Sequence, residues 1–446
     1  MKFKKTFSIL IGKFALFGCK LVGRGSSFPG EFAYKFNKNI LSDFTLPKTV
    51  IAVTGSSGKG STTKIINDVY KDLGYTTCYN SKGSNERGAV ISTLLENCNL
   101  KGVVKTDICV FEMDERYVKY VFPYIKPTHV VINNITRDQP PRQRHFDFVF
   151  DEIKKGLNKD TKLILNGDDP YLLNFNLDNT FDVTYFGIDK LKYSHKDNMF
   201  NSLNTYRCPK CLSTLKYNYY HIETLGDYKC SVCDLKRPKL EYKITSCNYD
   251  KNEIKINNKY KVNITNNMLF NLYNTLGAFT CLSLNNLNKE KIAKSISKMN
   301  NNSKIFSSYK YDKRDVYVLN NKAENASTYN QSILFTSRDK GKKTLVLGWM
   351  EISRRYNFDD LSWLYDIDFE ILNDNSIDKI ICCGPQKYDI AVRMKYAGFP
   401  EDKIKVFYDL YDAKDEIKDS KGTIYAILNF DYIKPFNEVM EELEWN

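Results

Sequence analysis

Short runs of β-branched and other apolar residues alternate with helical segments from Thr49 onward. The segment STTKIINDVYKDLG follows the first run, carries an apolar stripe at helical spacing and ends at Gly74. This alternation predicts a parallel β-sheet covered by crossover helices, which is an α/β fold. A helix containing MLFNLYNTLGAFTCLSL closes the block. The expected strands of the block are VIAVT, DICVFE, THVVINN and KLILNGD.

A second α/β region follows the polar stretch KMNNNSK, which is typical of a linker. Its expected strands are DVYVLNN, KTLVLGW, KIICCG and TIYAILNF, with a helix at YDIAVRMKYAG. We therefore expect a lead-in segment over 1–48, a central domain over 49–300 and a smaller C-terminal α/β domain over 301–446. A cysteine-containing insert at 205–240 interrupts the central pattern. Asparagine-rich pieces such as NFNLDNT and KNEIKINNK predict loops and hairpin turns.

The N-terminal segment predicts an amphipathic helix with a basic face. Lys13 and Lys20 interrupt its apolar stretch and no small-residue cleavage site follows, which argues against a signal peptide or a membrane span. Packing of this helix on its own domain is the favoured interpretation, and contact with an anionic membrane is the alternative. The apolar positions at helical spacing are Phe7, Leu10, Ile11, Phe14, Phe17 and Leu21.

Composition adds less than the pattern does. The 446 residues, 42% hydrophobic and 27% charged, suit a soluble globular chain of two or three domains. The net charge of +13 raises the possibility of an anionic partner. The lysines are spread among asparagines and tyrosines, so the codon bias of an AT-rich genome is the favoured explanation of this charge. Aromatic and basic residues form no stacking run outside the insert, so we expect no nucleic acid partner. Twelve cysteines, of which four form two CxxC pairs, indicate a reducing cytosol and one metal site.

The turn after the first strand predicts a phosphate site. Backbone N–H groups at a helix N-terminus converge on an anion, glycines allow close approach, and a lysine neutralises the charge. The strand, glycine-bearing turn and helix therefore predict ATP binding, although the spacing is tighter than the common G-x-x-x-x-G-K-[ST] form. The lysine is expected to reach the β and γ phosphates, and the hydroxyls that follow it are placed to meet Mg²⁺ or a phosphate oxygen. The candidate residues are Gly55, Ser57, Gly58, Lys59, Gly60, Ser61 and Thr62.

Polar residues end two later strands of the same block. Glu112 closes DICVFE, and Asn134, Asp138 and Gln139 follow the strand THVVINN. A parallel sheet places its ligands at the carboxyl ends of its strands. A lone carboxylate there is often only a surface residue, but together these side chains predict a polar rim that holds Mg²⁺ between ATP and a second substrate.

The insert contains the pairs CPKC and CSVC, which supply Cys208, Cys211, Cys230 and Cys233. Four thiolates on two tight turns complete a tetrahedral Zn²⁺ shell and leave no open position for water. We therefore predict a structural zinc ribbon, with a redox dithiol as the less favoured alternative.

Taken together, these motifs resemble the MurT family, a group of Mur ligase-like synthetase subunits. The resemblance extends over nearly the whole chain and includes the inserted ribbon, which ordinary Mur ligases lack. It implies a Mur ligase-like parallel-sheet ATPase domain followed by a smaller α/β domain. The segments that carry it are GRGSSFPGEFAYKF, VTGSSGKGSTT, VFEMDE, NNITRDQ, LNGDDP, FNLYNTLGA, FDDLSWLYDIDFE and CGPQKYDIAVRMKYAG.

The resemblance also implies an activity. ATP would phosphorylate the α-carboxylate of D-glutamate in the stem peptide of lipid II, and ammonia from a GatD-type glutaminase partner would give D-isoglutamine. Asp360 would complete the partner's Cys–His pair, and Asp366 is a weaker candidate for the same role. A purely structural role for Asp360, as a helix cap, is the alternative. The enzyme would work in the cytoplasm, with peripheral contact at the inner face of the membrane as a further expectation. The family motifs also point to Asn271 and Asn274 for the nucleotide and to Ser81, with Glu112, for magnesium.

Some positions depart from the family pattern. SSGK replaces TNGK, RDQPPR replaces RDQLDR, and IFSSYKY and NKAENAS stand where the family has GR and KNP motifs that help to hold the nucleotide. One alternative is therefore a stand-alone Mur-family ligase that joins an amino acid to another glutamyl or cell-wall peptide. A second alternative, from another class, is a non-catalytic ATP-binding scaffold or a nucleic-acid-binding zinc-ribbon protein.

Overall fold

The computed structural model describes residues 2–21, 26–80, 84–136, 145–201, 207–299, 306–321, 325–349 and 361–445. All eight expected strands and the expected helices form. Up to residue 299 the main elements are α1 (Lys2–Leu21), α2 (Phe28–Phe36), β1 (Thr49–Thr54), α3 (Lys59–Asp72), β2 (Thr77–Tyr79), α4 (Arg87–Asn97), β3 (Ile108–Glu112), α5 (Val118–Ile125), β4 (His129–Ile132), α6 (Phe146–Lys154), β5 (Lys162–Asn166), β6 (Asp182–Ile188), β7 (Leu215–Ile222), β8 (Leu225–Cys230), β9 (Tyr242–Asn248), β10 (Glu253–Ile256), β11 (Tyr260–Asn263), α7 (Leu269–Leu284) and α8 (Lys289–Lys298). From residue 306 they are β12 (Phe306–Tyr311), β13 (Arg314–Asn321), α9 (Ala326–Ser337), β14 (Lys343–Gly348), β15 (Ile377–Cys383), α10 (Lys387–Tyr396), β16 (Ile404–Phe407), α11 (Lys414–Lys418), β17 (Thr423–Asn429) and α12 (Phe430–Trp445).

A nine-stranded sheet forms the centre of the first part, in the order β11-β10-β9-β6-β5-β4-β1-β3-β2. The strands from β2 to β9 along this order pair in parallel, and β10 and β11 add an antiparallel edge. β1 lies between β3 and β4, so the carboxyl ends of these three strands meet at one edge of the sheet. The parallel α/β class expected for this block is confirmed, and the expected site residues follow these three strands.

Alternate residues of β1 enter two different cores. Ile51 and Val53 pack with the apolar faces of α3, α7 and α8, whereas Val50 and Ala52 pack with those of α4, α5 and α6. Period-two alternation of this kind is what a strand covered by helices on both faces requires. The sheet is therefore held from both sides, which fixes the position of the turn that follows β1.

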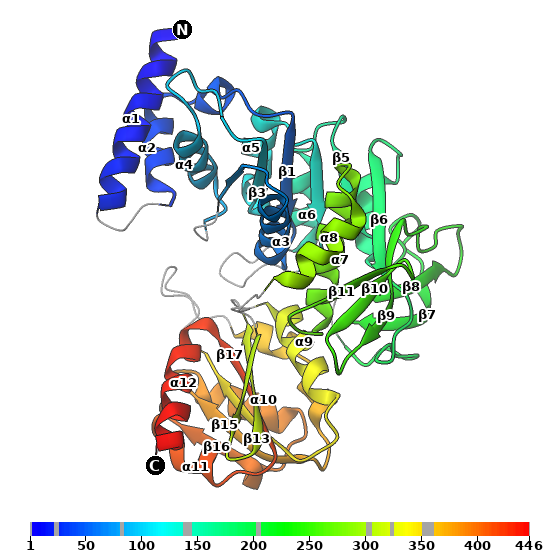
Figure 1. Cartoon of the computed structure of the whole chain (residues 1–446). Helices are drawn as coiled ribbons and strands as arrows, with labels where there is room; N and C mark the ends of the chain where they lie inside the picture. Colours follow the sequence, from blue (N-terminus) through cyan, green and yellow to red (C-terminus); the bar gives the residue numbers. More distant parts are fainter. Residues whose placement is uncertain are drawn as a thin grey trace.

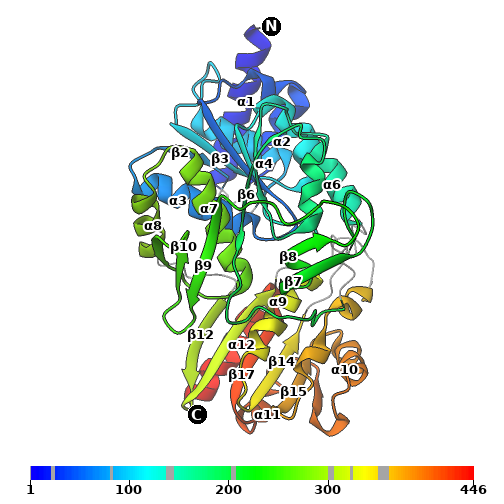
Figure 2. The same ribbon diagram turned by 90° about the vertical axis from the view of Figure 1, so that its right-hand side faces the viewer.

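The second part contains a six-stranded sheet in the order β12-β13-β17-β14-β15-β16. Only the β12–β13 pair is antiparallel. Figure 1 shows this sheet below the first one, with α1 and the N-terminus at the opposite end of the molecule. Figure 2 shows the small β7–β8 hairpin beside the junction of the two parts.

The N-terminal helix α1 packs on its own domain through one face. Ile9 and Leu16 are buried, and a Cβ atom on Gly12 would lie 2.6 Å from Leu95 and 3.0 Å from Ala33. The favoured interpretation of an intramolecular packing face is confirmed. Among the described helices, none is long and apolar enough to cross a membrane.

One expectation is partly wrong. The segment KNEIKINNK contains the strand β10 as well as the expected turn, in which Asn257 and Asn258 adopt positive φ angles of 50° and 58°. Ile254 and Ile256 of this strand are buried in the core, so two apolar residues in an otherwise polar segment suffice to pair it with β9. Residues 300–305 of the expected linker lie outside the described residues.

Candidate active site

Two glycines of the turn between β1 and α3 lie very close to neighbouring groups. Gly55 has a φ of 118°, and a Cβ atom there would lie 2.7 Å from the carbonyl oxygen of Asn134. Gly58, the residue before α3, has a φ of 80°, and its Cβ would lie 2.1 Å from Oδ1 of Asn274. Both positions favour glycine on conformation and on space, so the turn can present its N–H groups at the start of α3.

Asn134, which was expected at the rim, also holds this turn. Its Oδ1 accepts hydrogen bonds from the backbone N–H of Ser57 at 2.9 Å and from the Ser57 hydroxyl at 3.2 Å. The Ser56 hydroxyl donates to the carbonyl oxygen of Thr136 at 3.1 Å, and the Thr136 N–H donates back at 2.8 Å. The predicted rim residues Asp138 and Gln139 lie outside the described residues.

Lys59 folds back over the turn. Its Nζ donates to Glu115 Oε1 at 2.8 Å and to the carbonyl oxygen of Gly55 at 2.5 Å. Burial lowers the pKa of Lys59, but the attraction of the Glu115 carboxylate outweighs burial and raises the pKa above its ordinary value. The Lys59 ammonium group is therefore a positive charge that is fixed in place where we expect phosphates to bind.

Glu112, the last residue of β3, lies against the start of α3. A Cβ atom on Gly60 would lie 3.0 Å from Oε2 of Glu112, while Oε1 accepts a hydrogen bond from Asn85 Nδ2 at 3.0 Å. The expectation that this strand ends in a carboxylate beside the turn is confirmed by the geometry. Ser81, the second expected magnesium residue, lies outside the described residues.

Helix α7 reaches the turn through Asn274. The amide of Asn133 donates to Asn274 Oδ1 at 3.3 Å and to the Thr62 hydroxyl at 2.9 Å. Thr62 is buried and faces Asn133, while Ser61 is half-buried at the helix start. Asn271 donates instead to the carbonyl oxygen of Asn266 at 2.7 Å, away from the turn.

The four insert cysteines converge. Their sulfur atoms lie within 4.8 Å of one another, with Cys208–Cys233 at 3.6 Å and Cys211–Cys230 at 3.5 Å. A tetrahedral zinc with Zn–S bonds of about 2.3 Å spaces its sulfurs by about 3.8 Å, so the cluster has the size of such a shell. Hydrogen bonds from Ser213 lower the pKa of Cys211 to about 6, which favours the thiolate that a metal needs. The cluster can therefore hold a metal ion.

A buried charge network links the cysteine insert to helix α7. Asp168, fully buried after β5, accepts from Arg237 Nε at 2.7 Å and from the Tyr273 hydroxyl at 2.8 Å. Arg237 follows the second CxxC pair, and it also donates to the Tyr219 hydroxyl at 2.8 Å. Tyr273 precedes Asn274 on α7, so one carboxylate links the ribbon to the helix that touches the turn.

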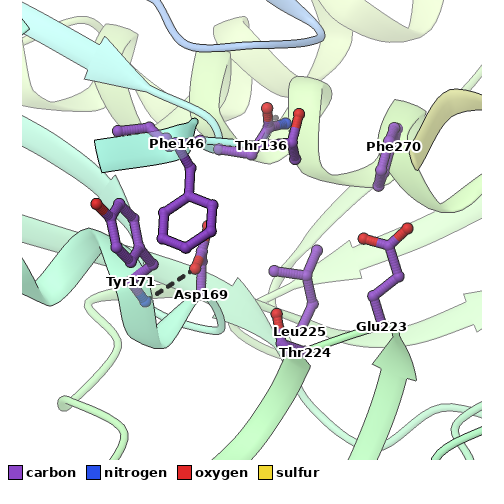
Figure 3. A pocket seen from close by; sticks show the side chains of 10 residues that line it. Thr136, Phe146, Asp169, Tyr171, Glu223, Thr224, Leu225 and Phe270 are labelled. Carbon is purple, nitrogen blue, oxygen red and sulfur yellow. Dashed lines mark hydrogen bonds between the residues drawn. The ribbon is translucent and has the colours of Figure 1, made fainter. Parts of the chain in front are cut away.

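Figure 3 shows a pocket next to the turn, with Asp169 beside Phe146 and Tyr171 on one side and Glu223 below Phe270 on the other. Burial is the main cause that raises the pKa of Asp169, to about 7, and the charge of Glu223 adds to it. The pocket adjoins the turn because Asn134 and Thr136 also line it. It therefore offers two buried carboxyl groups beside the phosphate site.

The C-terminal part closes the other side of this region. Asn325, the N-cap of α9, donates to the Thr136 hydroxyl at 3.2 Å. Glu223, at the tip of the β7–β8 hairpin, accepts from Ser327 Oγ at 3.1 Å and from Asn330 Nδ2 at 3.0 Å. Asn330 also donates to the backbone oxygen of Asp366 at 3.2 Å. Asp360 lies outside the described residues.

Sequence reasoning missed several residues of this site. Asn133 and Glu115 each lie one to three residues from a predicted one, so the motifs NNIT and EMDE carried a signal that was read too narrowly. Asp169 was quoted within LNGDDP without a role. Glu223 had no signal, because only the folded hairpin brings it to α9.

Two family models match the chain in line with this geometry. The Mur ligase middle domain matches residues 53–231, and the MurT ligase C-terminal domain matches residues 323–432. The subunit MurT of the lipid II isoglutaminyl synthase (glutamine-hydrolyzing) of Staphylococcus aureus strain COL is 28% identical over 438 residues, covering 97% of this chain and 96% of that protein. The MurT of Streptococcus pneumoniae is 28% identical over 416 residues, covering 91% and 89%.

Solved structures share the fold. A pseudomurein peptide ligase type C from Methanothermus fervidus has a TM-score of 0.68 at 20% identity, covering 91% of this chain and 81% of that one. The MurF ligase of Thermotoga maritima in complex with ADP has a TM-score of 0.60 at 16% identity, covering 93% and 84%. Together with the match to the Mur ligase middle domain, this fold places the chain among the Mur ligase-like proteins. Within that class its C-terminal part matches the MurT model and its nearly full-length relatives are MurT proteins, so the chain is a homologue of MurT.

The glycine at the start of α3 can be tested against a matched position. Gly58→Ala adds a Cβ at positive φ and against Asn274, whereas Gly74→Ala adds one at a similar φ of 89° in open space. Both variants should lose about 1 kcal/mol of stability from the backbone. Only Gly58→Ala should also weaken nucleotide binding, by roughly ten-fold or more, which corresponds to about 1.4 kcal/mol. Calorimetric titration with ATP measures the difference, and equal affinities would contradict the role of the close approach.

The metal cluster predicts one zinc ion per chain. Cys230→Ser removes one of four thiolates, so bound zinc should fall from about one equivalent to near zero and the ribbon should lose thermal stability. Cys247→Ser, a half-buried cysteine outside the cluster, is the control and should keep the metal. Elemental analysis by mass spectrometry measures the stoichiometry. A metal-free wild type with reversible disulfides would instead support the redox dithiol.

The buried carboxyl group of Asp169 predicts a pH dependence. Its folded pKa of about 7 lies above the value of 3.8 expected when unfolded, so the folded state binds the proton more tightly. The free energy of unfolding should therefore fall as pH rises from about 4 to about 8, by a few kcal/mol at about 1.4 kcal/mol per pKa unit. Asp169→Asn should remove this part of the dependence, whereas the exposed control Asp160→Asn should keep it. Urea unfolding at pH 5 and pH 8 measures it, and parallel curves for wild type and Asp169→Asn would refute the assignment.

Proposed function

We propose that this chain uses ATP to phosphorylate the α-carboxylate of D-glutamate in the stem peptide of lipid II, and that ammonia then converts the acyl phosphate into D-isoglutamine. The observation that carries the proposal is the combination of a lysine-bearing phosphate turn in the central sheet with a C-terminal domain of the MurT type. The relatives over nearly the full length are subunits of a glutamine-hydrolyzing lipid II isoglutaminyl synthase, which supports the choice of substrate. The division of the chain near residue 300 is part of this proposal, and the two separate sheets support it.

The chemistry follows from the weakness of a carboxylate as an electrophile. A carboxylate oxygen attacks the γ-phosphorus of ATP and ADP leaves, which gives the carbonyl carbon a phosphate leaving group. Ammonia then forms the C–N bond, and phosphate and a proton are released. Lys59 and the N-terminus of α3 supply positive charge where negative charge develops, so Lys59 exchanges its Glu115 partner for phosphate oxygens.

Glu112 fits the role of a magnesium ligand. Its carboxylate is half-buried beside the start of α3, and the amide of Asn85 orients one oxygen. Carboxylate oxygens and phosphates are the ligands that Mg²⁺ prefers, and the ion would neutralise charge between them when bound. Ser81 and the rim residues Asp138 and Gln139 remain part of this proposal.

The pocket beside the turn suits a nitrogen nucleophile better than a carboxylate. Asp169 and Glu223 both line the pocket, and their negative charge would repel an incoming carboxylate. A carboxyl group with a pKa near 7 is also suited to accept a proton from an incoming amine at neutral pH. We therefore place ammonia, rather than the acceptor carboxylate, in this pocket.

A GatD-type glutaminase is the proposed source of ammonia. The relatives are named as subunits of a glutamine-hydrolyzing enzyme, which supports a heteromeric assembly. Asp360 is the residue proposed to complete the partner's Cys–His pair, and it precedes the segment that Asn330 holds through the backbone of Asp366. The complex would act from the cytoplasm on the membrane-bound substrate.

Asp360→Asn tests this division of labour. With the partner and glutamine present, amidation of lipid II should fall by roughly 10²–10⁴-fold, the cost of losing the acid that orients a catalytic histidine. With ammonium chloride in place of glutamine, amidation should remain at the wild-type level, because the synthetase site is unchanged. Mass spectrometry of the lipid II product measures both rates.

Asp366→Asn is the matched control and should leave both rates near wild type. Loss of the glutamine-driven rate in Asp366→Asn alone would move the role to Asp366. Turnover with a free amino acid instead of ammonia would overturn the proposal in favour of a stand-alone ligase.

A further inference from the structure

Helix α1 is apolar on two opposite faces. The inner face, with Ile9, Gly12 and Leu16, packs against α2 and α4. The residues directly opposite Gly12 at 100° per residue are also large and apolar, but they are exposed to solvent. Their exposed fractions are 52% for Leu10, 78% for Phe14, 61% for Phe17 and 73% for Leu21.

The neighbouring helix α2 repeats this arrangement. Its inner face is so close to α4 that a Cβ atom on Gly30 would lie 2.0 Å from the carbonyl oxygen of Gly88. On the opposite face Phe28, Phe32 and Phe36 form a ladder of ring contacts at 5.8 Å and 5.1 Å, with Phe28 and Phe36 exposed. By contrast, none of the large apolar side chains of the surface helix α8 is exposed. We call the outward faces of α1 and α2 the apolar end face.

Charge and position indicate what covers the apolar end face. The sequence of α1 contains five lysines and no acidic residue within 20 positions. Two of these lysines contact α4, because Lys13 donates to the carbonyl oxygen of Leu95 and Lys20 pairs with Glu96 at 2.6 Å. The charge argument therefore rests on the lack of acidic residues in α1 and on the net charge of +13 of the whole chain. The apolar end face lies at the end of the molecule opposite the C-terminal sheet, so it is clear of the domain proposed to contact the glutaminase (Figure 1). A helix with Phe and Leu on one side and lysines elsewhere, too charged to span a bilayer, is the kind that lies in an anionic membrane interface.

We propose that the apolar end face binds the surface of an anionic lipid bilayer, with α1 lying in the interface. The choice of a membrane, rather than a protein, as the binding partner of this face rests in part on the proposed function, because lipid II is a membrane-bound substrate. Leu10, Phe14, Phe17 and Leu21 insert their side chains among the lipid headgroups, and the lysines of the chain are attracted to anionic lipid.

The test uses the full zinc-loaded chain and vesicles of phosphatidylglycerol and phosphatidylcholine, with pure phosphatidylcholine vesicles for comparison. Wild type should co-sediment with the anionic vesicles about ten-fold more strongly, and added salt should weaken this binding. Phe14→Ser with Phe17→Ser should lower binding by at least about ten-fold, because two large apolar side chains no longer insert. The matched control is Tyr388→Ser with Tyr396→Ser on α10, where exposed fractions are 66% and 74%, and it should bind as wild type does.

The outcomes separate the two proposals. Wild type that ignores anionic vesicles, or a Phe14 and Phe17 double variant that binds as well as wild type, would overturn membrane docking. A wild-type dimer that becomes monomeric in the double variant would assign the apolar end face to a second copy of the chain instead. Amidation of detergent-solubilised lipid II should be the same in wild type and in the double variant. If neither protein amidates lipid II while wild type still binds anionic vesicles, the result would count against the proposed function alone.

Discussion

The site depends on the close approach between one glycine turn and the backbone that follows a neighbouring strand. Gly55 lies against the carbonyl oxygen of Asn134, and Gly58 lies against the side chain of Asn274. A Cβ atom at Gly55 would meet backbone, and one at Gly58 would have to displace the Asn274 side chain, so glycine at both positions allows β1, β4 and α7 to meet at this point. The two packed cores on either side of β1 hold the strand in place, and they thereby fix the position of the turn that follows it.

A second constraint comes from the fully buried carboxylate of Asp168. A charge in the interior is costly unless it is paired and hydrogen-bonded, and Arg237 and Tyr273 satisfy both conditions. Because Arg237 belongs to the ribbon and Tyr273 to α7, the four-cysteine insert is linked to the helix that contacts the glycine turn. The hairpin tip continues this connection to α9 through Glu223, so the insert contacts both sheets of the molecule.

Many of the strands and the four-cysteine cluster could be predicted because their signals are local. Apolar runs predicted eight of the fifteen strands of the two sheets, and the spacing of CPKC and CSVC predicted the convergence of four sulfurs. The roles of single polar residues could not be predicted in the same way. Asn134 was expected on a ligand rim, and it also binds the turn. Asn271 lies three residues before Asn274 but bonds to the backbone of Asn266. Such roles depend on which way a side chain points after folding, and no periodicity carries that information.

The contact between Lys59 and Glu115 has a consequence for ligand selection. The ammonium group of Lys59 has a carboxylate partner in Glu115 and two carbonyl acceptors, so an incoming anion has to compete with Glu115 for it. A single weakly held anion offers little that Glu115 does not already provide. A polyphosphate can displace the carboxylate because it engages the helix terminus and the ammonium group at once. The internal pair thus favours ligands that present several anionic oxygens over ligands that present one.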